Sequence, residues 1–211
     1  MIKSFVLLSL SIFILSSCVS YKIGTVIPES KNVNSNLVFE NDTIKINYNF
    51  WGKNGLASFD IYNKLNIPIY LDWKKSAFIP NDKMMSYWQD ETNTMSSTLY
   101  SSYDYWGIFS GKANTKTKSI RQERVGVILP NAMITTKKYS LIPINTTLPI
   151  QKFSLSNTPL RFRNYLLVST SEQFDKNVFY VDNSFFVSSV IKTKESKYKT
   201  SKASNTFFIE N

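Results

Sequence analysis

The amino-acid sequence predicts an all-β protein built as a single antiparallel β-sandwich. Apolar and polar residues alternate with a period of two in several short runs, and turn-forming residues separate these runs. After the first 17 residues, no run has the spacing of an amphipathic helix. Short strands joined by frequent turns are typical of sandwiches and barrels, so the sequence favours that fold class.

The clearest strands are expected between residues 43 and 73. The run 43–50 alternates isoleucine or aromatic residues with threonine, lysine and asparagine, and a Gly-Lys-Asn-Gly turn at 52–55 leads to a second alternating run at 57–62. These two runs are expected to pair as a hairpin. A third run covers 67–73, where Pro68 favours the start of a strand or a sheet edge because proline has no N–H to donate.

Seven later strands are expected, each bounded by Asn, Pro, Asp or Ser: 76–79, 83–88, 124–129, 138–142, 165–170, 177–182 and 184–192. The alternative is that some of these runs belong to buried helices. Their short length and their content of β-branched and aromatic residues favour strands.

The amino terminus has the layout of a secretory signal. Lys3 precedes an apolar run at 5–15, and small residues follow. That run has about half of the roughly 20 residues that a membrane-spanning helix needs. The Leu-Ser-Ser-Cys sequence at 15–18 resembles a bacterial lipobox, which implies cleavage before Cys18 and attachment of acyl chains to it. The alternative is that Cys18 is an incidental cysteine of a signal or core segment.

The sequence divides into four expected parts. Residues 1–17 form the signal peptide, and 18–36 contain the lipidated cysteine and a polar, flexible tether. Residues 37–195 form the sandwich, with an insertion at 89–119, and 196–211 form a basic tail.

The phrase Asn-Lys-Leu-Asn-Ile-Pro-Ile-Tyr-Leu-Asp at 63–72 resembles small sandwich lipoproteins of Bacteroidota-type bacteria, many of which have no assigned function. The resemblance implies an immunoglobulin-like or fibronectin-like sandwich over 37–195, held in the cell envelope by its lipid. Val19, in place of an aspartate after the cysteine, indicates the outer membrane, while the leaflet stays open. The resemblance also implies O-glycosylation at an Asp-Thr-Ile sequence, with Thr43 as the acceptor.

The composition excludes several kinds of chemistry. The chain has no histidine and one cysteine, so His-ligated metal centres, Ser-His-Asp triads and an intrachain disulfide are all excluded. None of the six glycines has the spacing of a phosphate-binding loop. We therefore expect a non-enzymatic protein with no cofactor and no metal.

The insertion at 89–119 carries aromatic residues among Ser, Thr and Asp. Tyr100, Tyr103, Tyr105 and Trp106 are the candidate residues of a carbohydrate- or peptide-binding surface, since rings give stacking area at low entropic cost. The alternative is structural, with this segment folded over the sandwich or added as an extra strand.

Three carboxylates of the insertion suggest a second alternative, a carboxylate-based hydrolase. Asp90, Glu91 and Asp104 would supply an acid and a base or nucleophile. Solvated loop carboxylates are the more ordinary interpretation.

The net charge is +10, and the basic residues gather in two places: Lys112, Lys116, Lys118, Arg121 and Arg124, and then Lys192, Lys194, Lys197, Lys199 and Lys202. Such clusters attract anionic lipid, polysaccharide or nucleic acid, or simply form a solvated face. The signal and the scarcity of arginine argue against nucleic acid. After the second cluster, residues 207–209 could dock as a final strand or onto a partner.

The leading expectation is a lipid-anchored envelope protein acting as an interaction or accessory module. Its expected partners are the membrane, through the lipid anchor, and a protein of the envelope, with a carbohydrate ligand as the alternative.

Overall fold

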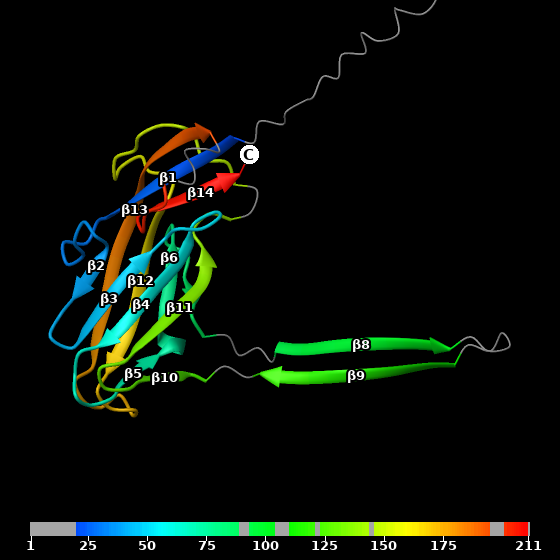
Figure 1. Ribbon diagram of the computed structural model, residues 1–211. Coiled ribbons are helices and arrows are strands. Elements are labelled where there is room, and N and C mark those ends of the chain that lie inside the picture. The colour runs from blue at the N-terminus through cyan, green and yellow to red at the C-terminus, as the bar shows by residue number, and fades with distance from the viewer. Residues whose placement is uncertain are drawn as a thin grey trace, which may run out of the picture.

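The structure is a computed structural model, and it describes residues 20–88, 93–103, 110–120, 123–143, 146–194 and 201–210. Its fold is an antiparallel β-sandwich of two sheets, from which a separate two-stranded hairpin extends (Figure 1). The predicted all-β class is confirmed, because the one helical element in the described ranges is the short 3-10 turn η2 (Trp73–Lys75).

The larger sheet, called sheet A, has eight strands. Six of them follow the order β10 (Val125–Ile128), β5 (Ile69–Asp72), β12 (Arg161–Ser169), β13 (Phe179–Lys194), β1 (Ser20–Pro28) and β14 (Thr206–Glu210). The other two are β6 (Ala77–Pro80) and β7 (Met85–Ser86). β5 and β6 pair with successive parts of β12, so the turn η2 that joins them lies over that strand.

The smaller sheet, called sheet B, has the order β11 (Met133–Ser140), β4 (Leu56–Asn63), β3 (Ile44–Asn49) and β2 (Val38–Glu40). The predicted hairpin is confirmed, since β3 and β4 are antiparallel neighbours. In its turn, Asn54 and Gly55 have φ values of 59° and 69°, a left-handed conformation that asparagine and glycine adopt most readily.

The core lies between the inward faces of the two sheets. The alternation predicted for 43–50 and 57–62 holds, because Ile44, Ile46 and Ile61 are fully buried. Aromatic rings join the layers: the ring centroid of Phe50 lies 5.2 Å from those of Phe162 and Phe185, in T-shaped contacts.

A polar network crosses this core. The Tyr48 hydroxyl on β3 accepts hydrogen bonds from the side-chain amides of Asn164 (3.0 Å) and Asn183 (2.7 Å), on β12 and β13. Tyr87 donates to Asn164 Oδ1 at 2.7 Å. Burial is the main cause that raises the pKa of Tyr48 to about 12. The network links the two sheets with hydrogen bonds that a misaligned pair of sheets would leave unmade.

Strand β1 lies inside sheet A, between β13 and β14, where a flexible tether was expected. Ile23 and Val26 are buried, and Gly24 lets the ring of Phe207 pack directly on the backbone. The tether predicted over 18–36 is therefore wrong from Ser20 onward. A β-bulge between Thr25 and Val26 interrupts the alternation that would have revealed the strand.

Several predicted boundaries also change. The two strands predicted at 177–182 and 184–192 are the single strand β13, and the strand predicted at 138–142 is β11, which begins at Met133. The basic tail predicted from 196 ends in β14, which confirms the alternative that residues 207–209 form a final strand. The backbone N–H of Asn54 donates to the carbonyl of Phe208 at 2.7 Å and protects the outer edge of β14.

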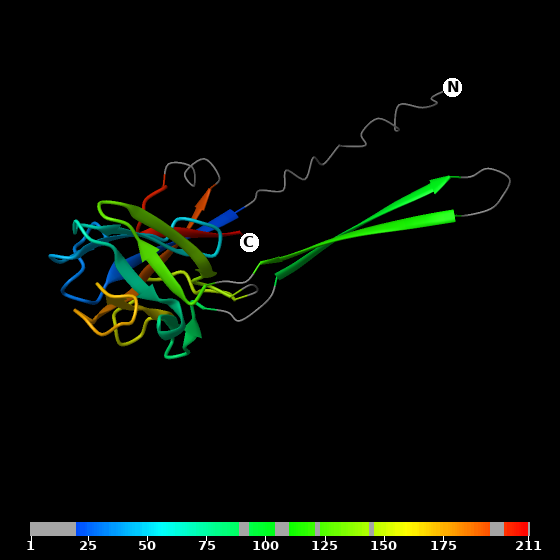
Figure 2. The same ribbon diagram turned by 90° about the horizontal axis from the view of Figure 1, so that it is seen from below.

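The insertion expected as an irregular loop instead contains the hairpin of β8 (Asn93–Tyr103) and β9 (Ser110–Ile120). Eleven residue pairs keep one register from end to end. Figures 1 and 2 show, from two directions, that this hairpin extends well beyond the sandwich. The sequence did not predict it, because its strands lack the apolar face on which periodicity arguments depend.

Candidate functional site

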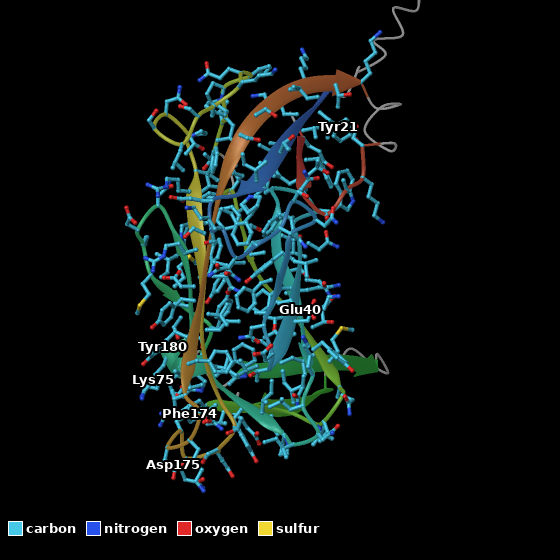
Figure 3. All side chains as sticks on the ribbon, turned by 90° about the vertical axis from the view of Figure 1, so that its left-hand side faces the viewer. Tyr21, Glu40, Lys75, Phe174, Asp175 and Tyr180 are labelled. Atoms are coloured by element: carbon cyan, nitrogen blue, oxygen red, sulfur yellow. The ribbon has the colours of Figure 1, made fainter. Side chains whose placement is uncertain are left out.

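The outer face of sheet A has a hollow of about 420 Å³, here called the outer groove. Its lining includes Lys74, Lys75, Met84, Arg163, Tyr165 and Tyr180. These residues come from η2, the β6-β7 turn, β12 and β13. Figure 3 shows Lys75 and Tyr180 at one end of the sandwich and Tyr21, near the start of β1, at the other.

Asp72 positions Lys74 and Lys75, the two lysines at the edge of the outer groove. It is buried at the end of β5, and its Oδ1 accepts the backbone N–H groups of Lys74 (3.0 Å) and Lys75 (3.1 Å), so it caps η2. Arg124 donates to Asp72 Oδ2 at 2.6 Å. Burial opposes ionisation of Asp72, but the hydrogen bonds from Arg124 and Lys75 outweigh it and lower the pKa. The carboxylate therefore fixes the turn that places two lysines beside the groove.

Two tyrosines form the aromatic part of the outer groove. The rings of Tyr165 on β12 and Tyr180 on β13 stack with centroids 5.3 Å apart and planes 27° apart. Tyr180 is 60% exposed, so its ring is open to a ligand. Desolvation raises the pKa of Tyr165 above the ordinary value of a phenol, and the neutral hydroxyl can donate a hydrogen bond. Open rings in a hollow suit flat or ring-shaped ligands.

Arg163 borders the tyrosine pair and is held by a carboxylate from the next strand. Its Nε donates to Asp182 Oδ1 at 3.0 Å, and its Nη2 donates to Oδ2 of the same residue. This bidentate contact raises the pKa of Arg163, chiefly through the hydrogen bonds from the guanidinium to the carboxylate. The pair holds the guanidinium across β12 and β13.

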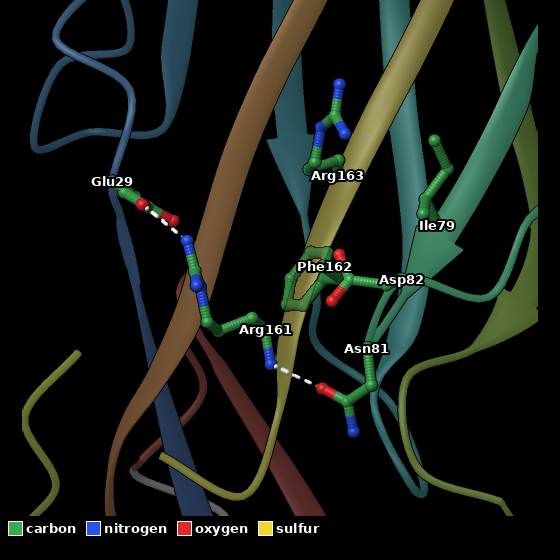
Figure 4. A pocket seen from close by; sticks show the side chains of 7 residues that line it. All are labelled: Glu29, Ile79, Asn81, Asp82, Arg161, Phe162 and Arg163. Atoms are coloured by element: carbon green, nitrogen blue, oxygen red, sulfur yellow. Dashed lines mark hydrogen bonds and ion pairs between the residues drawn. The ribbon is translucent and has the colours of Figure 1, made fainter. Parts of the chain in front are cut away.

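A second, smaller hollow of about 130 Å³ shares Arg163 and Ile79 with the outer groove (Figure 4). Here Arg161 Nη2 donates to Glu29 Oε1 at 2.7 Å, and the backbone N–H of Arg161 donates to Asn81 Oδ1 at 2.9 Å. Asn81 has a φ of 43° and lies in the tight turn between β6 and β7. Its hydrogen bond with Arg161 attaches this turn to β12.

On this face of sheet A the arginines form ion pairs with acidic residues, whereas the lysines form none within the described structure. Glu29 and Asp182 each hold an arginine, whereas neither Lys74 nor Lys75 forms an ion pair with another described residue. Lys74 instead lies with its Nζ 5.1 Å from the centre of the Trp88 ring, a cation–π arrangement. The face can therefore attract an anionic group and stack a ring.

The structure places few of the predicted site residues. Tyr100 and Tyr103 belong to β8, where they pair with Ala113 and Ser110 of β9. Tyr105, Trp106 and the carboxylates Asp90, Glu91 and Asp104 lie outside the described residues.

Cys18 also lies outside the described residues, and no described helix has the length and hydrophobicity to cross a membrane. Thr43 lies in the turn between β2 and β3, partly exposed, with its backbone N–H bonded to Asn41 Oδ1 at 2.9 Å.

The residues of the outer groove were missed by sequence reasoning. One signal was present: Arg161, Arg163 and Tyr165 alternate with the buried residues Phe162 and Asn164, so three polar or aromatic side chains share one face of β12. Their partners on β13 and η2 are distant in sequence, and only the fold brings them together.

Comparisons with known proteins identify no relative. No family model matches the chain, and neither a curated protein nor a solved structure shows significant similarity to it. Within the ranges that the structure describes, no group of three or more Asp, Glu or Cys side chains is arranged to hold a metal ion. The outer groove is therefore the feature of the described structure from which a function can be inferred.

Proposed function

We propose that the chain is a lipid-anchored, non-enzymatic protein of the cell envelope that acts as an interaction module through the outer groove. One observation supports the binding role: the exposed Tyr180 ring lies beside two lysines that have no acidic partner in the described structure. The carboxylates of the same face, Glu29 and Asp182, are each held in an ion pair with an arginine. Such a surface binds a ligand without transforming it.

The anchor proposed at Cys18 depends on the lipobox and has a direct test. The mass of the mature protein purified from native membranes should correspond to a chain that begins at Cys18 and carries acyl groups. Cys18→Ala should move the protein out of the membrane fraction, since at least two chains are needed for stable anchoring. An unmodified Cys18, or a Cys18→Ala protein that stays in the membrane, would contradict this anchor.

A second, more specific function is carbohydrate binding at the outer groove. It is favoured by the stacked Tyr165 and Tyr180 rings, which offer a sugar the kind of aromatic platform that the composition of the insertion predicts for residues 100–106. Lys74 and Lys75 favour sugars that carry a carboxylate.

Titration of the protein with a polyuronate and with a neutral glucan tests this function. Tyr180→Ala should weaken polyuronate binding about tenfold, the equivalent of one lost stacking contact of about 1.4 kcal/mol. Tyr62→Ala is the matched control, because Tyr62 lies on β4 of the opposite sheet. Equal affinities of the two variants would show that the groove is not the binding site.

A further inference from the structure

The start of β1 lies very close in the chain to the proposed lipid anchor. The strand begins at Ser20, which pairs with Lys194 of β13, so Val19 alone separates the sheet from Cys18. Two residues of extended chain span at most about 7 Å. With Cys18 acylated, this end of the sandwich is therefore held at the membrane surface and has no spacer to move away from it.

The same end carries a patch of aromatic and aliphatic side chains on the outer face of sheet A. The ring of Phe208 lies 6.3 Å from that of Tyr21 and 5.5 Å from that of Trp51, between centroids. Ile191, opposite Ile23 in the neighbouring strand, is 54% exposed. We call Tyr21, Trp51, Ile191 and Phe208 the anchor-side patch. Tyrosine and tryptophan are the residues enriched at the headgroup level of membranes.

Positive charge accompanies the anchor-side patch. Lys192 and Lys194 are exposed at the same end of β13, on the opposite face of the strand from Ile191, and neither forms an ion pair with another described residue. The nearby carboxylate of Glu210 is matched by Lys53. Basic side chains near an anionic bilayer strengthen binding to it through their attraction to the headgroups. The charge therefore suits anionic headgroups.

We infer that the anchor-side patch is a membrane-contacting surface, with its side chains in the headgroup region of an anionic bilayer and Lys192 and Lys194 beside them. This inference rests on the proposed acylation of Cys18. Figure 1 shows the start of β1 and the ends of β13 and β14 together at one end of the sandwich. Because Lys75 and Tyr180 lie at the other end (Figure 3), the outer groove lies at the end of the sandwich that is distant from the anchor.

Tryptophan quenching by brominated lipid tests the inference. The mature acylated protein is reconstituted into vesicles of equal parts phosphatidylcholine and phosphatidylglycerol, both with brominated chains, and its fluorescence is compared with that in unbrominated vesicles. The wild type should be quenched, and Trp51→Phe should lose this quenching while keeping an aromatic ring against Phe208. Trp88→Phe, at the groove end, is the matched control and should be quenched like the wild type.

The charge component has its own variant. Lys192→Glu with Lys194→Glu should reduce quenching in the anionic vesicles at low salt, and the difference from the wild type should disappear near 1 M salt, where the Debye length is about 3 Å. Acylated protein that shows no Trp51-dependent quenching would overturn the inference and leave the anchor standing. A mass spectrum with unmodified Cys18 would overturn the proposed anchor and this inference with it.

Discussion

Gly24→Ala is the sharpest test of the role of β1. A Cβ at position 24 would lie 2.1 to 2.6 Å from three carbons of the Phe207 ring, far inside contact distance, and Phe207 is fully buried. The ring must move, which costs about 1–3 kcal/mol for an overpacked core. If the ring is expelled, the loss approaches the 3–5 kcal/mol typical of a deleted core phenylalanine. We expect a loss of about 1–3 kcal/mol if the ring shifts within the core, and more if it is expelled.

Urea unfolding, followed by tryptophan fluorescence, measures this loss as a lower midpoint. Thr25→Ala is the neighbouring control, since Thr25 lies on the outer face and should change stability little. In a double-mutant cycle with Phe207→Ala, the alanine at 24 should cost almost nothing once the ring is absent, giving a coupling of about 1–3 kcal/mol. Additive effects, or a Gly24→Ala protein as stable as the wild type, would refute the packing of β1 against β14.

Two further predictions concern pH. The pKa of Tyr48 is raised from about 10 to about 12. About 3 kcal/mol of folding stability is therefore present below pH 10 and is lost as the pH rises to 12. Tyr48→Phe should be less stable than the wild type at neutral pH, and urea titrations should show this difference narrowing above pH 10. The pKa of Asp72 is lowered, so its contribution is present above about pH 4 and is lost as the pH falls through the folded-state value. Asp72→Asn keeps an amide cap but loses the charge that binds Arg124, and should cost about 2 kcal/mol at pH 7. Thermal melts should show this cost shrinking in acid, and a constant difference would contradict it.

The sequence predicted the parts of the fold that depend on local alternation. β3 and β4 are predicted correctly because one face of each strand is buried and a turn with left-handed residues at Asn54 and Gly55 joins them. β1 was missed because a bulge breaks its alternation. The sequence pattern divides β13 in two at Asn183, because asparagine is typical of turns; in the structure Asn183 is a buried strand residue that donates a hydrogen bond to Tyr48 across the core. Composition alone cannot distinguish a polar residue that is buried in the core from a polar residue that lies in a turn.

The outer groove could not be predicted for a different reason. It depends on register: Tyr165 meets Tyr180 only because β12 and β13 pair with a particular offset. Likewise, Arg124 reaches Asp72 across 52 positions of sequence. Sequence patterns give the face on which a residue lies but not its neighbour on the next strand, so the groove appeared only in three dimensions.

The place of β1 also governs when the chain can fold. The first of the described strands, β1, has as its two neighbours the last two described strands, β13 and β14. Its hydrogen bonds close loops of more than 150 residues, the kind of long-range pairing that makes folding slow. During synthesis the central ladder of sheet A stays incomplete until β13 and β14 have been made, so the residues of β1 must wait for partners more than 150 positions later in the sequence.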